Sequence, residues 1–344
     1  MQNRITKAGK LLKSDGTLAQ RGYATELLLQ YERSAIKAKK FKIKEWDYYY
    51  IGNKDYGVAL TVADNSYLGM MGLSLLDFRK PFDHTSSEIV PFTNGSLKMP
   101  ATSVVGDIAY KNKKIDISFT NDGKTRRLTA KHANFFEGKP LEIDITLTDV
   151  PQQSIVIATP FEGAPTAFYY NQKINCMSAV GYCKFGDEEY IFNAENGSLG
   201  TLDWGRGVWT YKNTWYWGSL STVIDGHKFG FNIGYGFGDT TAASENVLFY
   251  DGKHHKLNEV TFNIPKKGSD YDYMSPWTFE SDDNRLNMTF TPLVDRFSDT
   301  NVGLIRSCQH QVFGEFSGHA ILDDGTVIDL NKEVGFAERV TNKW

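Results

Sequence analysis

The sequence predicts an all-β fold in two halves of antiparallel strands with little helix, and three observations predict it. From Trp46 onward, apolar and polar residues alternate with a period of two, which is typical of strands. Aromatic residues make up 14% of the 344 residues, and such enrichment favours strands over helices. The turns are short and rich in Asp-Gly, as at Asp225-Gly226 and Asp251-Gly252.

The first half should contain about eight strands by residue 160, enough to close a small barrel around one small ligand. Strand-like alternation covers residues 46–53, 56–64, 66–78, 103–132 (three strands), 141–150 and 154–161. A single short helix is expected near TELLLQYERSAIKA (25–38).

The Pro and Gly residues of TPFEGAPT (159–166) predict a boundary between the halves. We therefore expect one domain over residues 1–165 and a second, carrying most of the tryptophans, over 166–344. Alternation resumes after the boundary, over residues 168–185, 214–238, 245–265, 276–292 and 301–330.

Composition excludes several classes of function. A formal net charge of −3 gives no general basic field for nucleic acid. No segment approaches 18 uninterrupted apolar residues, so we expect no transmembrane segment, and the N-terminus has no apolar core of signal-peptide length.

Cys176, Cys183 and Cys308 are an odd number without metal-ligand spacing, which predicts free thiols in the cytoplasm. No phosphate-binding loop, nucleophile elbow or histidine cluster is present, so we expect no cofactor and no metal.

Four of the seven tryptophans fall between Ser198 and Ser219, beside Asp203 and Arg206; they are Trp204, Trp209, Trp215 and Trp217. We expect a turn at 203–206 near the mouth of a pocket that these indoles help to line. Asp203 among indoles could stay protonated and act as a general acid. If it pairs with Arg206 instead, it is a structural clasp, and any acid must be Glu245, Glu315 or Glu338. The competing interpretation is that the tryptophans are ordinary core residues.

The strand HKFGFNIGYGFG (227–238) has one bulky face and one face of four glycines and Asn232. Two interpretations stay open. Either the glycine face borders a cavity, or its glycines permit curvature of the sheet or close packing of the two halves. With Asn232, further polar groups that we expect at the pocket are Glu245, Asn246, Gln309, Gln311 and Glu315.

Several motifs together resemble a bacterial family known as a domain of unknown function, over nearly the whole chain. They are RGYATELLLQY (21–31), KEWDYYYI (44–51), LDWGRGVWTYKNTWYWGS (202–219), ENVLFYDGKHHKL (245–257), PWTFES (276–281) and FGEFSGHAILDDGTVIDLNKEVGFAERVTNKW (313–344). More remotely, the family is similar to carotenoid hydratases, AttH-like proteins, fungal Diels–Alderase-like enzymes and a yeast ceramide carrier. The resemblance implies two lipocalin-like β-barrel halves.

The carotenoid hydratases have Asp-His-x-Trp-Gly where this chain has Thr201-Leu202-Asp203-Trp204-Gly205, so Leu202 replaces the histidine. Their Tyr-x-Asp acid has no counterpart in FGFNIG (229–234), which contains no carboxylate. The resemblance thus transfers no acid to this chain.

Three functions follow as hypotheses. The first is a lipocalin-like binder of a small apolar ligand, such as a lipid or isoprenoid. The second is a metal-free hydratase, cyclase or isomerase on the same scaffold. The third is a structural or interaction protein without a small-molecule site.

Overall fold

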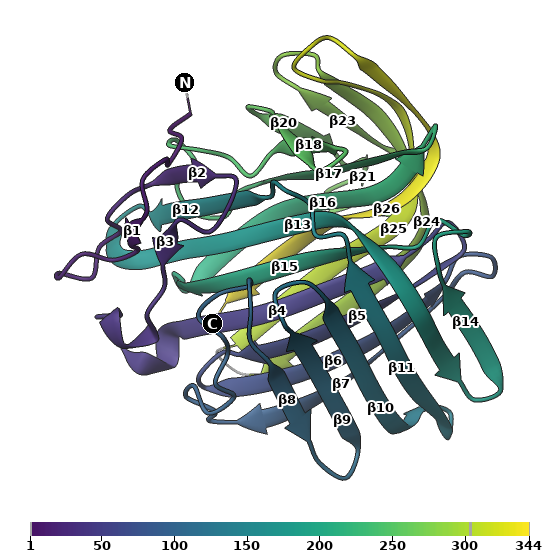
Figure 1. Ribbon diagram of the computed structural model, residues 1–344, viewed down its shortest axis with the longest axis horizontal. Helices are drawn as coiled ribbons and strands as arrows, with labels where there is room; N and C mark the ends of the chain where they lie inside the picture. Colours follow the sequence, from purple (N-terminus) through teal and green to yellow (C-terminus); the bar gives the residue numbers. More distant parts are fainter. Residues whose placement is uncertain (1, 303–304, 344) are drawn as a thin grey trace.

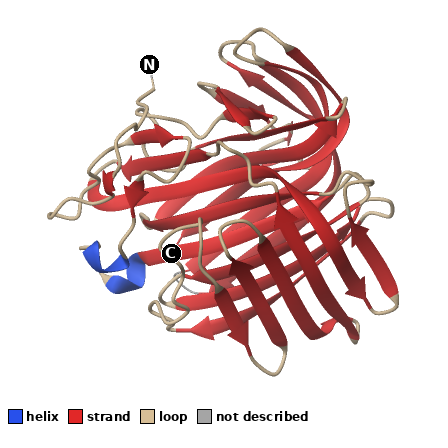
Figure 2. Cartoon of the chain, in the orientation of Figure 1, coloured by secondary structure: helices blue, strands red, loops and turns tan. Residues whose placement is uncertain are grey.

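The computed structural model describes residues 2–302 and 305–343, and two large curled sheets account for most of them (Figures 1 and 2). The first sheet has 13 strands: β2 (Gly22–Ala24), β4 (Ile43–Gly52), β5 (Tyr56–Asp64), β6 (Leu68–Asp77), β7 (Phe82–Pro91), β8 (Ile108–Lys111), β9 (Ile115–Asn121), β10 (Arg126–Phe136), β11 (Lys139–Thr148), β12 (Ile155–Phe161), β13 (Ala164–Phe185), β14 (Glu188–Phe192) and β15 (Leu199–Val208). The second has nine: β16 (Lys212–Ile224), β17 (His227–Tyr235), β18 (Val247–Tyr250), β19 (Lys253–Lys256), β20 (Val260–Asn263), β23 (Trp277–Ser281), β24 (Leu286–Val302), β25 (Ile305–Ile321) and β26 (Val327–Lys343). All pairings within these two sheets are antiparallel, which confirms the predicted all-β class.

The first sheet runs in the order β7-β6-β5-β4-β15-β13-β11-β10-β9-β8 and curls around its own core. Its edge strand β7 comes back to β10, where the Ser86 hydroxyl lies 3.1 Å from His132 Nε2. The alternating apolar residues of each strand fill the inside of this half-barrel, as period-two patterning requires.

The second sheet runs in the order β19-β18-β17-β16-β26-β25-β24-β23-β20 and encloses a separate aromatic core. Its strands β24, β25 and β26 are 17 residues long each and extend beside the first sheet (Figure 1). Two small pairs lie outside these sheets: β1 (Gly9–Lys10) with β3 (Leu29–Gln30), and β21 (Lys266–Lys267) with β22 (Asp270–Tyr271).

The chain changes sheet between Val208 and Lys212, not at 159–166. Residues 159–166 form the hairpin from β12 to β13 within the first sheet, so the Pro and Gly residues there mark a tight turn. The 22-residue β13 then pairs with β12, β15, β11 and β14. Its register on β15 shifts at Cys176, whose φ of 63° is unusual for a non-glycine residue.

A third apolar cluster lies between the two sheets and explains why β4 is buried on both faces. Tyr49 and Ile51 point into the core of the first half-barrel. Tyr48 and Tyr50 point the other way, where the ring of Tyr50 lies 5.1 Å from that of Phe313 in β25. The outer face of one sheet therefore packs on the outer face of the other.

The helix predicted over 25–38 does not form. Residues Leu29 and Gln30 form β3, and only two 3-10 turns follow, η1 (Arg33–Ala35) and η2 (Lys40–Lys42), which are blue in Figure 2. Leu29 and Tyr31 are buried while Gln30 between them is exposed, which is the period of a strand. No helix among the described residues is long and apolar enough to cross a membrane.

Candidate functional site

A cavity of about 220 Å³ lies between the two sheets, beside the third apolar cluster. Seven aromatic side chains, from both sheets and from the segments that follow β15 and β17, line it: Trp46, Tyr48, Tyr169, Trp209, Trp215, Trp217 and Phe237. Phe237 is packed edge-on against its neighbours, with its ring centre 4.8 Å from that of Tyr169 and 4.9 Å from that of Trp209. Edge-to-face packing of this kind is a favourable arrangement of aromatic rings.

One group of charged residues reaches this wall from three parts of the chain. Lys173 of β13 faces Asp203 of β15 in direct register, and its Nζ lies 2.9 Å from Asp203 Oδ2. The same amine lies 4.0 Å from a carboxylate oxygen of Glu245 and 3.8 Å from the centre of the Trp217 ring. Lys173 is only 3% exposed, so this pair is largely removed from solvent and its attraction is strong.

Glu338 of β26 is a second buried carboxyl group of the cavity, and it is 3% exposed. Its Oε1 accepts a hydrogen bond from Trp215 Nε1 at 2.8 Å, and its Oε2 accepts hydrogen bonds from Gln311 Nε2 at 3.0 Å and Gln309 Nε2 at 3.3 Å. Burial, with a smaller contribution from the charge of Asp203, raises the pKa of Glu338 to about 7. A substantial fraction of Glu338 therefore carries a proton at neutral pH.

Asn232 lies just behind the wall and holds two cavity residues in place. Its Oδ1 accepts a hydrogen bond from Trp217 Nε1 at 2.6 Å, and its Nδ2 donates to Glu245 Oε2 at 3.2 Å. Burial raises the pKa of Glu245, although the nearby charge of Lys173 opposes this shift.

The glycine face of β17 makes room for close neighbours, as one of the two interpretations predicted, but its residues do not line the cavity. A Cβ atom on Gly230 would lie 2.7 Å from Cys176 Sγ of β13, so this glycine allows the sheets to approach closely. A Cβ atom on Gly234 would lie 2.7 Å from Glu245 Oε1, so this glycine makes room for a cavity carboxylate.

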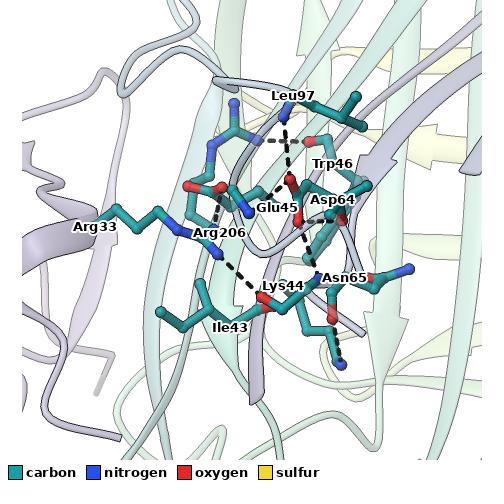
Figure 3. A network of polar contacts seen from close by, with 12 residues as sticks. Arg33, Ile43, Lys44, Glu45, Trp46, Asp64, Asn65, Leu97 and Arg206 are labelled. Carbon is teal, nitrogen blue, oxygen red and sulfur yellow. Dashed lines mark hydrogen bonds and ion pairs between the residues drawn. The ribbon is translucent and has the colours of Figure 1, made fainter. Parts of the chain in front are cut away.

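The structure places Trp204 and Arg206 away from the cavity and corrects the expected turn at 203–206. These residues belong to the middle of β15, so Asp203 and Arg206, three apart, point to opposite faces. Arg206 is fully buried in the first half-barrel, where it pairs with Asp47 at 2.9 Å, and its guanidinium lies 4.4 Å from the ring centre of Trp204. The Arg206 guanidinium also donates to the backbone oxygen of Trp46 at 2.7 Å. Figure 3 draws this hydrogen bond as a dashed line. The Asp203–Arg206 clasp is therefore wrong, because each residue has another partner.

Two more predicted residues do not line the cavity. Glu315 is partly exposed beyond Phe313 and pairs with Lys332 at 3.5 Å. Asn246 accepts a hydrogen bond from the Gly234 backbone and donates to the carbonyl of Asn258, so it ties β17 to residues before β20. By contrast, the predicted residues that do line the cavity are Asp203, Trp209, Trp215, Trp217, Glu245, Gln309, Gln311 and Glu338.

Sequence analysis missed Lys173, Trp46, Tyr48 and Arg296, which also line the cavity. Lys173 had a detectable signal, since it is the single cation between Phe168 and Val180 in a strand of mainly apolar and neutral residues. Trp46 and Tyr48 alternate with Asp47, but alternation alone does not show which face of a strand packs against a second sheet.

Chemically, this arrangement combines an apolar wall with a proton-bearing carboxyl group and a buried ion pair. Among the described residues, no three His, Cys, Asp or Glu side chains are grouped to hold a metal ion. The cavity can therefore bind an apolar body, place polar groups of a ligand against carboxyl and amide side chains, and deliver a proton from Glu338.

The chain is similar to proteins of known structure and to one sequence family. An AttH-type protein from Nitrosomonas europaea has a similar structure, with 13% identity, a TM-score of 0.55, and coverage of 90% of this chain and 96% of that one. Kievitone hydratase from Nectria haematococca matches with 12% identity and a TM-score of 0.47, and 98% of each chain is covered. No curated protein sequence matches the chain. The sequence profile of the family described as a domain of unknown function, DUF2804, matches residues 2–344, and the chain belongs to that family.

Proposed function

We propose that the protein binds a small, mainly apolar ligand in the cavity between its two sheets. The observation that carries this proposal is an aromatic cavity with convergent polar groups, which is the usual composition of a small-molecule site. Its volume of about 220 Å³ is below the range of about 300–1,000 Å³ that suits drug-sized molecules, so the ligand is small. A purely structural role predicts side chains that fill this space, and the cavity argues against that role.

The test of binding is a titration with N-phenyl-1-naphthylamine, an uncharged apolar dye that fluoresces when it leaves water. Wild-type protein should bind it with saturation. Val340 lines the cavity from β26 and is buried, so Val340→Phe should fill the space and abolish binding. Val327→Phe, on an exposed position of the same strand, is the matched control and should bind as wild type does. Equal binding by both variants would remove the cavity as the site.

Mass spectrometry of organic extracts from protein purified from its own host then identifies the natural ligand. A compound that is retained by wild type and lost from Val340→Phe belongs to the cavity. The three unpaired cysteines favour a cytoplasmic location for this protein, because unpaired thiols are typical of a reducing compartment.

A second candidate function, an acid-catalysed hydratase, cyclase or isomerase, is favoured by Glu338. Burial favours the protonated form of this carboxyl group, whereas the hydrogen bonds that it accepts from the Trp215 indole and two glutamine amides favour the ionised form. Within residues 2–302 and 305–343 its recorded hydrogen-bond partners are all donors, so a ligand could take its proton. In a hydration, the Glu338 proton would add to an alkene carbon and leave a carbocation. Water would bond to the cation through oxygen and return one proton to the Glu338 carboxylate. The adjacent indole rings would stabilise the cation, by about 0.5–2 kcal/mol each.

The variant Glu338→Gln separates the two functions. It preserves shape and removes the proton donor, so it should still bind the dye, whereas turnover of the extracted compound should fall at least 100-fold. Because Glu338 must be protonated to act as the acid, kcat should decline as pH rises through about 7. Glu315→Gln alters a carboxylate outside the cavity and should leave turnover unchanged. Unchanged turnover in Glu338→Gln would exclude this acid and leave binding alone.

A further inference from the structure

Asn342 of β26 lines the cavity with a side chain whose hydrogen-bonding capacity is unused. The residue is 3% exposed, and within residues 2–302 and 305–343 neither its Nδ2 nor its Oδ1 has a hydrogen-bond partner. Buried amides are nearly always paired, because burial without a partner destabilises the fold. Both amide atoms are closed to solvent in this structure, so a rotation of the Asn342 side chain toward the cavity is needed before a ligand can pair with them.

The position of Asn342 defines an uncharged polar end of the cavity. Alternation along β26 puts Glu338, Val340 and Asn342 on one face, and all three line the cavity. In register, Asn342 lies opposite Ser307 of β25, while Glu338 lies opposite Gln311. Asn342 lies four positions after Glu338 along the strand, a rise of about 13 Å. The buried carboxyl therefore marks one end, and neutral amide and hydroxyl groups mark the other.

Lys44, the cation of β4 nearest the Asn342 end of the cavity, already has other partners. Lys44 lies on the same face of β4 as Trp46, but its Nζ donates to the backbone oxygen of Asn65 at 3.2 Å, as Figure 3 shows, and lies 4.0 Å from the Tyr67 ring centre. Lys44 does not line the cavity, and burial lowers its pKa to about 7, so it is a weak partner for an anion there.

We propose that Asn342 recognises a neutral group of the ligand that both donates and accepts hydrogen bonds, namely a carboxamide or a hydroxyl. This proposal rests on the proposed binding function and deepens it. The ligand is then an amphipathic molecule with an apolar middle that faces the indoles and a neutral polar terminus about 13 Å from Glu338. A carboxylate offers only acceptors, so it would leave Asn342 Oδ1 facing a negative charge.

Three probes with the same apolar body test this inference: 6-phenylhexanamide, 6-phenylhexanoate and hexylbenzene. Each is used to displace N-phenyl-1-naphthylamine from wild type, Asn342→Leu and Asn342→Ser. Wild type should bind the amide about tenfold more tightly than hexylbenzene, equivalent to about 1.4 kcal/mol, and more tightly than the carboxylate. Asn342→Leu should lose that preference while its affinity for hexylbenzene stays the same or rises. Asn287→Leu, at an exposed position of β24, is the control and should keep the preference.

The outcomes separate this inference from the function on which it rests. If wild type binds hexylbenzene but shows no amide preference, or binds the carboxylate as tightly, the role of Asn342 is overturned and the binding function stands. If wild type binds none of the probes and no dye, both are overturned. If Asn342→Leu does not fold, Asn342→Ser, which is smaller and remains polar, should still reduce the amide preference, and an unchanged preference in that variant would also overturn the inference.

Discussion

Lys173 Nζ lies 2.9 Å from Asp203 Oδ2, and the two residues face each other directly across β13 and β15. Both side chains line the cavity, so this ion pair links two strands of the first sheet and also forms part of the wall of the proposed site. Its energetic contribution can be measured separately from ligand binding.

Replacement of Lys173 by methionine should lower the free energy of unfolding by about 3 kcal/mol, because it leaves the buried Asp203 carboxylate without its cation. Urea denaturation monitored by tryptophan fluorescence measures this change. The double variant Lys173→Met with Asp203→Leu removes both charges and should recover at least half of the loss. A single variant as stable as wild type would show that the pair contributes little.

The raised pKa of Glu338 predicts that the protein becomes less stable as pH rises. The group titrates near 7 in the folded protein and near 4.3 in the unfolded chain, so between these values only the folded state holds the proton. The titration of Glu338 should therefore lower the free energy of unfolding by roughly 3 kcal/mol between about pH 4.3 and 7. The pKa of Glu245 is also raised, so its titration lowers stability in the same way as pH rises.

The measurement for this prediction is a series of urea denaturation curves from pH 5 to 8, for wild type and Glu338→Gln. Glutamine does not titrate, so the variant should show a shallower fall. Parallel curves for the two proteins would mean that Glu338 titrates normally in the folded state.

An added methyl group at Gly234 should disturb the cavity from behind. Gly234→Ala would place Cβ 2.7 Å from both Glu245 Oε1 and the backbone oxygen of Tyr216, and we expect a loss of about 1–3 kcal/mol and weaker dye binding. Gly9→Ala, where a Cβ meets no atom within 4 Å, is the control and should be nearly neutral. Normal dye affinity in Gly234→Ala would show that Glu245 can move without consequence for the cavity.

The three thiols should react at very different rates with a thiol reagent. Cys176 and Cys183 are buried, and burial raises the pKa of Cys176 to about 12 and raises that of Cys183 as well. Cys308 is partly exposed, so native protein should show one accessible thiol and denatured protein three. Cys308→Ser should abolish the native reaction. Two or more fast thiols in the native state would contradict the burial of the β13 cysteines.

Much of the fold follows from the sequence, because local alternation and turn residues act over a few positions. Period-two patterning specified the strands from Trp46 onward, and the cluster of tryptophans indicated a region that contributes three of its four indoles to the cavity. The helix predicted over 25–38 was wrong. Three consecutive leucines are compatible with the period of a helix and with that of a strand, and the pairing of β3 with β1 stabilises the strand.

Tertiary structure alone decided which face of each strand the site uses. In β15 and β4 both faces are buried, one in a half-barrel and the other against the second sheet, so a period of two does not distinguish them. The sequence by itself determined the strands, the turns and the supply of aromatic and carboxyl side chains. The register of β13 on β15 put Lys173 beside Asp203, and only the packing of the two outer faces brought Glu338, more than 100 positions away in the sequence, into the same cavity wall. Both depend on strand order and register rather than on local pattern.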